Sequence, residues 1–234
     1  MKLYILDIGN THTRYGLMND NKIVFSGNID TTGLNKLEIP DDTAVAASTV
    51  VPEAKKLLKR KDIFWINNTI KLNMDLSQVD SAKLGADRIA NLAALIEMNK
   101  YPGIIIDCGT AVNIEVIDSN KVFRGGLIAP GRYLQRKALN NYTALLPLVN
   151  VDNKESQTLG LNTEDAIRIG TDAGVIGTVR EFLYNIKKKI EIDSNNIYVT
   201  GGDADVLLKN IEGLKSVSPD FTLLGIAALW KYNN

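Results

Sequence analysis

The sequence predicts an α/β fold made of two similar halves, and three observations lead to this prediction. Short apolar runs bounded by turn residues, typical of buried strands, alternate with longer stretches typical of helices. The stretch Leu3–Gly27 has a second copy at Ile104–Gly125. A chain of 234 residues is long enough for two modest domains. We therefore expect an N-terminal half over 1–100 and a C-terminal half over 101–234.

Each copy predicts three strands joined by tight turns. In the first, an apolar run ends in an Asp-x-Gly motif followed by Thr at Asp7–Thr11, and two further runs flank Asn21-Lys22. In the second, the same order appears at Asp107–Ala111 and at Asn120-Lys121. Because chance rarely reproduces such an order, we interpret the two stretches as a duplicated three-stranded meander.

Helices are predicted between and after these meanders. Residues 81–100 carry apolar side chains near a 3.6-residue period. Residues 163–189 begin at a suitable N-cap, Thr163, and carry acidic residues near the start and lysines near the end. Phe221–Tyr232 predicts a final helix.

Two smaller features lie in the C-terminal half. Gly170, Gly174 and Gly177 share one face of the 163–189 helix, and glycine is costly inside a helix, so we expect another backbone to pack closely there. Ile197–Thr200 predicts a strand followed by a Gly-Gly turn, after which Asp203 is placed to cap a helix.

Composition excludes several classes of protein. Lys+Arg and Asp+Glu are both 27, so the formal net charge is zero and nothing draws the chain to nucleic acid or acidic membranes. One cysteine, Cys108, and one histidine, His12, exclude an intrachain disulfide and a histidine-rich metal site. No apolar run reaches the ~20 residues of a membrane span. We expect a cytoplasmic protein without nucleic-acid or membrane partners.

The turn after the first strand has the composition of a phosphate-binding loop. Gly9 lets the backbone approach a ligand closely, and backbone N–H groups with the hydroxyls of Thr11 and Thr13 suit phosphate oxygens. Arg14 adds a planar cation, and Asp7 suits Mg²⁺ held through water. A hairpin that only caps its own backbone is the alternative for one copy alone. The second copy, with Thr110, favours a nucleotide cleft.

The chain carries neither a G-x-x-x-x-G-K-[ST] loop nor a G-x-G-x-x-G turn after a strand. The paired hairpins resemble those of the acetate and sugar kinase, heat-shock ATPase and actin superfamily. More closely, the chain resembles type III pantothenate kinases over nearly its whole length. Eight stretches in the same order carry this resemblance: Asp7–Thr11, Ala47–Pro52, Leu84–Arg88, Asp107–Ala111, Gly125–Gly131, Thr143–Pro147, Thr163–Gly170 and Thr200–Gly202.

The resemblance implies two ribonuclease-H-like (actin-like ATPase) domains, each with a mixed sheet flanked by helices. It implies ATP-dependent phosphorylation of pantothenate to 4′-phosphopantothenate, the first step of coenzyme A biosynthesis. It also implies a homodimer that requires Mg²⁺ and K⁺ or NH₄⁺. The helices of the second half would then form the dimer.

The resemblance also assigns residues to roles. Asp87 would be the catalytic base, and Asp107 would bind the monovalent cation. The residues expected to contact ATP are Asp7, Gly9, Asn10, Thr11, His12, Thr13, Arg14 and Thr110. Those expected to contact pantothenate are Gly85, Ala86, Asp87, Arg88 and Thr163.

Asp87 also has a purely structural interpretation, because a carboxylate at a helix N-terminus is stabilised by the helix dipole. As a base it would accept the proton of the substrate hydroxyl, and Arg88 could bind the pantothenate carboxylate with two hydrogen bonds. Two alternative functions remain open. The altered stretch Gln78–Ser81 suits a kinase of another small hydroxy acid or polyol, and the fold alone would suit a non-catalytic regulatory homologue.

Overall fold

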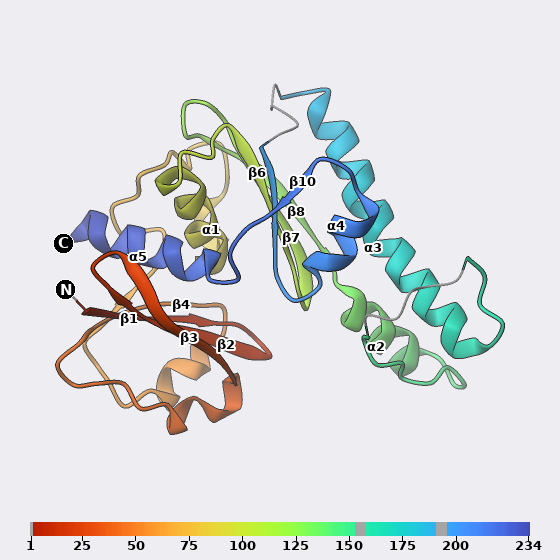
Figure 1. Ribbon diagram of the computed structural model, residues 1–234, viewed down its shortest axis with the longest axis horizontal. Coiled ribbons are helices and arrows are strands. Elements are labelled where there is room, and N and C mark those ends of the chain that lie inside the picture. The colour runs from red at the N-terminus through yellow and green to blue at the C-terminus, as the bar shows by residue number, and fades with distance from the viewer. Residues whose placement is uncertain (1, 153–157, 191–195) are drawn as a thin grey trace. The chain divides into compact units, whose positions relative to one another are not determined.

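The computed structural model describes residues 2–152, 158–190 and 196–234 (Figure 1). The chain divides into two compact units. The first unit comprises Met1–Tyr101, Ile117–Gly125 and Ser218–Asn234, and the second comprises Pro102–Val116 and Gly126–Val217. The C-terminal segment, which the sequence analysis placed with the second half, therefore makes its contacts within the first unit.

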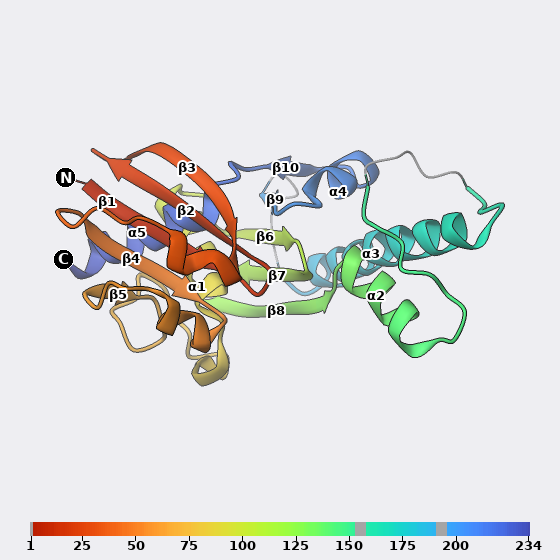
Figure 2. The same cartoon turned by 90° about the horizontal axis from the view of Figure 1, so that it is seen from below.

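A mixed five-stranded sheet in the order β3-β2-β1-β4-β5 forms the frame of the first unit (Figure 2). The strands β1, β2 and β3 pair antiparallel as a meander, whereas β4 pairs parallel with β1 and β5 with β4. Their bounds are β1 Lys2–Ile8, β2 His12–Asn19, β3 Lys22–Asp30, β4 Ala44–Thr49 and β5 Ile63–Trp65.

The second sheet repeats this arrangement. Its order is β10-β9-β6-β7-β8. Written from the other edge, as β8-β7-β6-β9-β10, it corresponds strand by strand to β3-β2-β1-β4-β5 of the first sheet. Parallel strands β9 and β10 follow the central β6, as β4 and β5 follow β1. The bounds are β6 Gly103–Cys108, β7 Ala111–Ile117, β8 Phe123–Pro130, β9 Ile197–Thr200 and β10 Leu214–Ser216. The predicted duplicated meander is confirmed.

Two helices, α1 (Ala86–Glu97) and α5 (Phe221–Asn233), lie side by side against one face of the first sheet (Figure 1). Alternate residues of β1, Leu3 and Ile5, pack in the same core cluster as these helices. Glycine at position 225 permits the close approach, because any side chain there would collide with the carbonyl of Ala90. Short 3-10 helices, Thr31–Lys36 and Pro52–Leu57, accompany the opposite face.

Three helices belong to the second unit. They are α2 (Arg132–Tyr142), α3 (Thr163–Lys187) and α4 (Ala204–Asn210). Val175, Val179 and Leu183 of α3 and Leu207 of α4 pack in the core cluster that contains β6 and β7. The strands and helices expected at 163–189, 197–200 and 221–232 are therefore confirmed, with bounds shifted by at most two residues.

Local details correct two expectations. The 81–100 segment is a 3-10 turn, Ser81–Lys83, followed by α1, because Leu84 is extended and Gly85 is the N-cap of a new helix. The N-cap of α3 is Asn162, whose side chain accepts a hydrogen bond from Asp165 N, not Thr163.

The glycine stripe of α3 was expected to meet another backbone. Within the described residues, nothing lies within 4 Å of a Cβ placed on Gly170 or Gly177, and Gly174 meets only the side chain of Gln135. The expectation is therefore wrong for the described residues of a single chain, where no other backbone lies against this face of α3.

Candidate active site

The first Asp-x-Gly turn projects from the carboxyl end of β1. Asp7 follows Leu3 and Ile5 on the face of β1 that α1 and α5 cover, since alternate residues of a strand share a face. Its Oδ1 accepts a hydrogen bond of 2.5 Å from the hydroxyl of Ser48, the residue paired with it on β4. The carboxylate is thereby fixed at the edge of the turn.

A second segment braces the turn from behind. The Thr31 hydroxyl donates to Gly9 O at 2.8 Å, and Thr31 N donates to Thr11 O at 3.0 Å. Thr13 is buried, and its hydroxyl lies 3.1 Å from that of Thr31. Thr13 therefore supports the turn instead of lining it, which leaves Asn10 and Thr11 exposed at its tip. Thr31 could not be predicted from the sequence, because it follows β3, and no local pattern indicates that it contacts the turn between β1 and β2.

Arg14 does not extend freely from the turn. Its Nε and Nη2 donate to Oδ1 of Asp220, at 2.8 and 2.6 Å, and its Nη1 donates to Asn28 Oδ1 at 3.3 Å. Asp220 directly precedes α5, so the guanidinium joins β2 to the start of this helix. His12, also expected near ATP, is exposed and lies 3.4 Å from Asp30.

Asp87 occupies the first turn of α1. It is half-buried, and its Oδ1 accepts a hydrogen bond from Arg88 N at 2.9 Å. Burial raises the pKa of the Asp87 carboxyl above the ordinary aspartate value of 3.8, although the Arg88 N–H and the Arg88 charge act in the opposite direction. The Arg88 guanidinium lies 5.7 Å from the centre of the Phe123 ring. A carboxylate with a raised pKa beside a fixed cation suits proton transfer.

The Asp7 turn and the start of α1 are neighbours through β4. Val50 N, at the end of this strand, donates to Ile8 O at 3.2 Å. A Cβ on Gly85 would lie 3.7 Å from a methyl carbon of the same Val50. The first unit therefore gathers the first turn, Ser48 and the Gly85–Arg88 segment at one end of its sheet.

The second unit holds the second Asp-x-Gly turn at the end of β6. Gly109 N donates to Ala111 O at 2.9 Å, as Gly9 N donates to His12 O in the first turn. Gly201, with a φ of +97°, packs on this turn: a Cβ there would lie 2.7 Å from Asp107 Oδ1. Thr110 is exposed at the tip. Cys108 is buried in the core, and burial raises the pKa of its thiol to about 12.

Thr163, the remaining predicted substrate residue, is the first residue of α3. It lines a cavity of about 730 Å³ whose walls come from α2, α3 and the segment after α2. The lining includes Leu134, Leu139, Leu146 and Ile167, so the cavity is mainly apolar.

In the part of the chain that the structure describes, no three or more His, Cys, Asp or Glu side chains are placed to hold a metal ion together. Asp7 and Asp107 stand as single carboxylates at their turns. The same described residues include no helix that is both long and apolar enough to span a bilayer.

Comparisons with known proteins identify the family. Residues 3–185 match the sequence profile of type III pantothenate kinases. A type III pantothenate kinase of Methylacidiphilum infernorum is 30% identical over 96% of this chain and 86% of its own length. One from Rubrobacter xylanophilus is 28% identical over 99% of this chain and 98% of its own.

A solved structure supports the fold. The activator of 2-hydroxyisocaproyl-CoA dehydratase from Clostridium difficile, determined with bound ADPNP, matches with a TM-score of 0.61 at 16% identity, over 99% of this chain and 95% of that one. The two matching mixed sheets are those of the actin-like ATPase fold, as the sequence predicted. On the profile match and the relatives' similarity, the chain belongs to the type III pantothenate kinase family.

Proposed function

We propose that this protein transfers the γ-phosphoryl group of ATP to the terminal hydroxyl of pantothenate, which yields 4′-phosphopantothenate and ADP in the first step of coenzyme A biosynthesis. Family membership supports the reaction. The observation that carries the mechanism is Asp87, a half-buried carboxylate with a raised pKa at the end of the sheet that also bears the Asp7 turn.

Asp87 acts as the catalytic base. Its carboxylate accepts the proton of the substrate hydroxyl while that oxygen forms a bond to the γ-phosphorus and the bond to the β,γ-bridging oxygen breaks. Phosphoryl transfer depends mainly on positioning and charge stabilisation, so one carboxylate is sufficient as a base. The raised pKa brings its basicity closer to that required at neutral pH.

The two turns hold the nucleotide. In the first unit, Asn10 and Thr11 offer exposed polar groups, whereas Gly9, Thr13 and Arg14 shape the turn through the contacts above. In the second unit, the exposed Thr110 has the matching place after β6. His12 lies at the rim of the first turn.

Two ions fit the single carboxylates. Asp7, an oxygen donor held by Ser48, suits Mg²⁺ bound largely through water and phosphate oxygens. Asp107, packed beneath Gly201, suits K⁺ or NH₄⁺. Mg²⁺, when bound, neutralises charge on the phosphates.

Pantothenate binds at the start of α1. Gly85 and Ala86 offer backbone without bulk, and Arg88 pairs with the substrate carboxylate, for which a planar guanidinium is well shaped. Thr163, on the cavity between α2 and α3, is proposed to contact pantothenate near the dimer interface.

We further propose that α2 and α3 pair with a second copy of the chain. Large apolar side chains are exposed around them, including Tyr142 at 89%, Leu145 at 91% and Leu161 at 86%. Exposed apolar patches of this kind mark interaction sites. The glycine face of α3, against which no other backbone of the described residues packs, permits close packing of another helix.

An assay of ADP release tests the proposal. With pantothenate, ATP and Mg²⁺, the protein releases ADP and forms 4′-phosphopantothenate, detected by mass spectrometry. Asp87→Asn lowers kcat by roughly 10²–10⁴. Glu97→Gln, the same change at the exposed far end of α1, is the matched control and retains activity.

The acceptor is tested separately. Turnover with another hydroxy acid or polyol, but not with pantothenate, would replace the substrate and keep the kinase. No ADP release with any acceptor would favour a regulatory homologue.

A further inference from the structure

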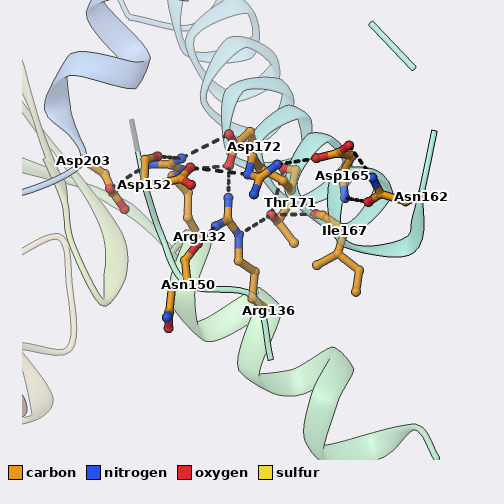
Figure 3. Close-up of polar contacts among 11 residues, drawn as sticks. Arg132, Arg136, Asn150, Asp152, Asn162, Asp165, Ile167, Thr171, Asp172 and Asp203 are labelled. Carbon is orange, nitrogen blue, oxygen red and sulfur yellow. Dashed lines mark hydrogen bonds and ion pairs between the residues drawn. The ribbon is translucent and has the colours of Figure 1, made fainter. Parts of the chain in front are cut away.

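Two arginines are completely enclosed in the second unit. The side chains of Arg132 and Arg136 are 1% and 0% exposed, and both contact Asp172 of α3 (Figure 3). Arg132 pairs with both carboxylate oxygens of Asp172, through Nε at 2.7 Å and Nη2 at 3.1 Å. Arg136 Nη2 donates to Asp172 Oδ1 at 2.8 Å. The two arginines lie on consecutive turns of α2, and both bind the carboxylate of Asp172.

They differ in what else they hold. Arg136 donates to the hydroxyl of Thr171, at 3.0 Å, and to the carbonyl of Asn150. Arg132 donates through Nη1 to Oδ1 of Asp203, at 3.0 Å, and through Nη2 to Asp152 O. Only Arg132 therefore reaches the turn between β9 and α4 (Figure 3).

Asp203 lies at the N-terminus of α4, where the sequence suggested a cap. Its side chain makes no capping hydrogen bond and pairs with Arg132. Its backbone N–H donates at 2.9 Å to the carbonyl of Cys108, in the middle of the Asp107–Thr110 turn. Gly201, two residues earlier, covers Asp107. The turn at 201–203 thus packs directly against the second Asp-x-Gly turn.

The residue before Arg132, Gly131, also contacts the Asp107–Thr110 turn. Gly131 N donates to Thr110 O at 3.0 Å, and a side chain on Gly131 would collide with the carbonyl of Gly109. Arg132 is thus linked to the Asp107–Thr110 turn in two ways. Its neighbour Gly131 contacts Thr110, and its side chain pairs with Asp203, whose turn packs against Cys108. Asp172 fixes the guanidinium from α3.

We propose that Arg132 is a positioning residue for nucleotide binding: by joining Asp203 to Asp172 it holds the Gly201–Asp203 turn against the Asp107–Thr110 turn. This inference rests on the proposed function, in which Thr110 and Asp107 serve ATP and the monovalent cation. A buried ion pair often adds little net stability relative to apolar packing. Here the specific consequence of the ion pair is that it fixes the positions of two turns, Gly201–Asp203 and Asp107–Thr110, relative to each other.

Arg136 provides a matched control. Arg132→Met and Arg136→Met each remove one buried charge and leave Asp172 with one arginine, but only the first breaks the link to Asp203. Asp203→Ala breaks the same link from the less buried side and leaves both arginines on Asp172. It tests the inference even where a buried substitution impairs folding.

Two readouts are needed. The first is amide hydrogen exchange of residues 107–110 and 200–204 in the protein without nucleotide. The second is the Kd for ADPNP by calorimetry, with KM for ATP and pantothenate. Arg132→Met and Asp203→Ala are expected to speed exchange in both turns and to raise the Kd for ADPNP about tenfold, with KM for pantothenate little changed. Arg136→Met is expected to lower Tm but to leave both turns protected and the Kd within about twofold.

The outcomes separate the inference from the function. Equal effects of Arg136→Met and Arg132→Met, or no effect of Asp203→Ala, overturn the positioning role. If Arg132→Met and Asp203→Ala speed exchange but the wild-type protein binds no ADPNP, the link between the two turns is upheld and the nucleotide function is overturned.

Discussion

The carboxylate of Asp87 occupies the space that a side chain on Gly85 would need. A Cβ on Gly85 would overlap Oδ1 of Asp87, the same oxygen that accepts the hydrogen bond from Arg88 N at 2.9 Å. The absence of a side chain at position 85 therefore sets the orientation of the proposed base. The residues of the Gly-x-Asp-Arg sequence therefore depend on one another: Gly85 leaves room for the Asp87 carboxylate, which accepts a hydrogen bond from Arg88 N.

Gly85→Ala should impair catalysis more than folding. The added methyl group displaces the Asp87 carboxylate, and a displacement of about 1 Å can cost about 10²-fold in rate. We expect kcat for pantothenate phosphorylation to fall by that order, with KM for ATP unchanged. Gly33→Ala is the control, because its Cβ meets Ile29 at 3.4 Å, an ordinary contact. Full activity of Gly85→Ala would show that the carboxylate position does not matter.

Asp87→Asn should stabilise the protein while it inactivates it. Because burial raises the folded-state pKa above 3.8, the unfolded chain releases this proton at lower pH, and stability falls as pH rises from 3.8 through the raised pKa. The neutral amide avoids this loss and can still accept from Arg88 N. Thermal melts from pH 4 to 8 should give a Tm difference in favour of the variant that grows with pH. A lower Tm for the variant at pH 7 would contradict the desolvation argument.

The rate should follow the same ionisation. The base works only when ionised, so kcat/KM should rise with pH through a limb whose midpoint lies above 3.8. The measurement is a pH profile of kcat/KM at saturating Mg²⁺, with a stability check at each pH. Disappearance of this limb in Asp87→Asn, at its residual rate, would assign the limb to Asp87. A limb that persists there would assign it to another group.

Much of the fold was predictable from the sequence, because it depends on local patterns. The two meanders and the helices at 86–97, 163–187 and 221–233 follow from apolar periodicity and turn residues, which act over a few neighbours. The repeat also predicted that each sheet contains an equivalent three-stranded meander. The Asp7 and Asp107 turns lie where the motif placed them.

The supporting contacts were not predictable, since they join distant segments. Arg14 and Asp220 are 206 positions apart, and the sequence favoured a phosphate contact for Arg14 because only its neighbours were visible. The sequence did not single out Arg132 and Arg136, since charged side chains are seldom fully buried. Only the fold reveals that Asp172, 40 positions from Arg132, makes their burial possible.

Asp107→Ala should change the ion dependence of the reaction. Asp107 is the only side-chain carboxylate of the second turn, so its removal takes away the charge proposed to hold K⁺ or NH₄⁺. We expect the wild-type rate to increase with K⁺ at constant ionic strength and the variant rate to stay flat and low. Asp205→Ala, at an exposed carboxylate in the first turn of α4, should retain the K⁺ response. A wild-type enzyme fully active in Na⁺ alone would remove the ion from the proposal.

Gly170→Leu should separate the role of the α3 face in assembly from its role in folding. Among the described residues of one chain, nothing lies within 4 Å of a Cβ at this position. Leucine also favours a helix over glycine by roughly 1 kcal/mol, so the monomer should be at least as stable. Against a second copy the same side chain would block close packing. Light scattering after gel filtration should show the wild type as a dimer and Gly170→Leu shifted to monomer. Val24→Glu, at an exposed apolar residue of β3, should remain dimeric. A Gly170→Leu protein that stays dimeric would place the interface elsewhere.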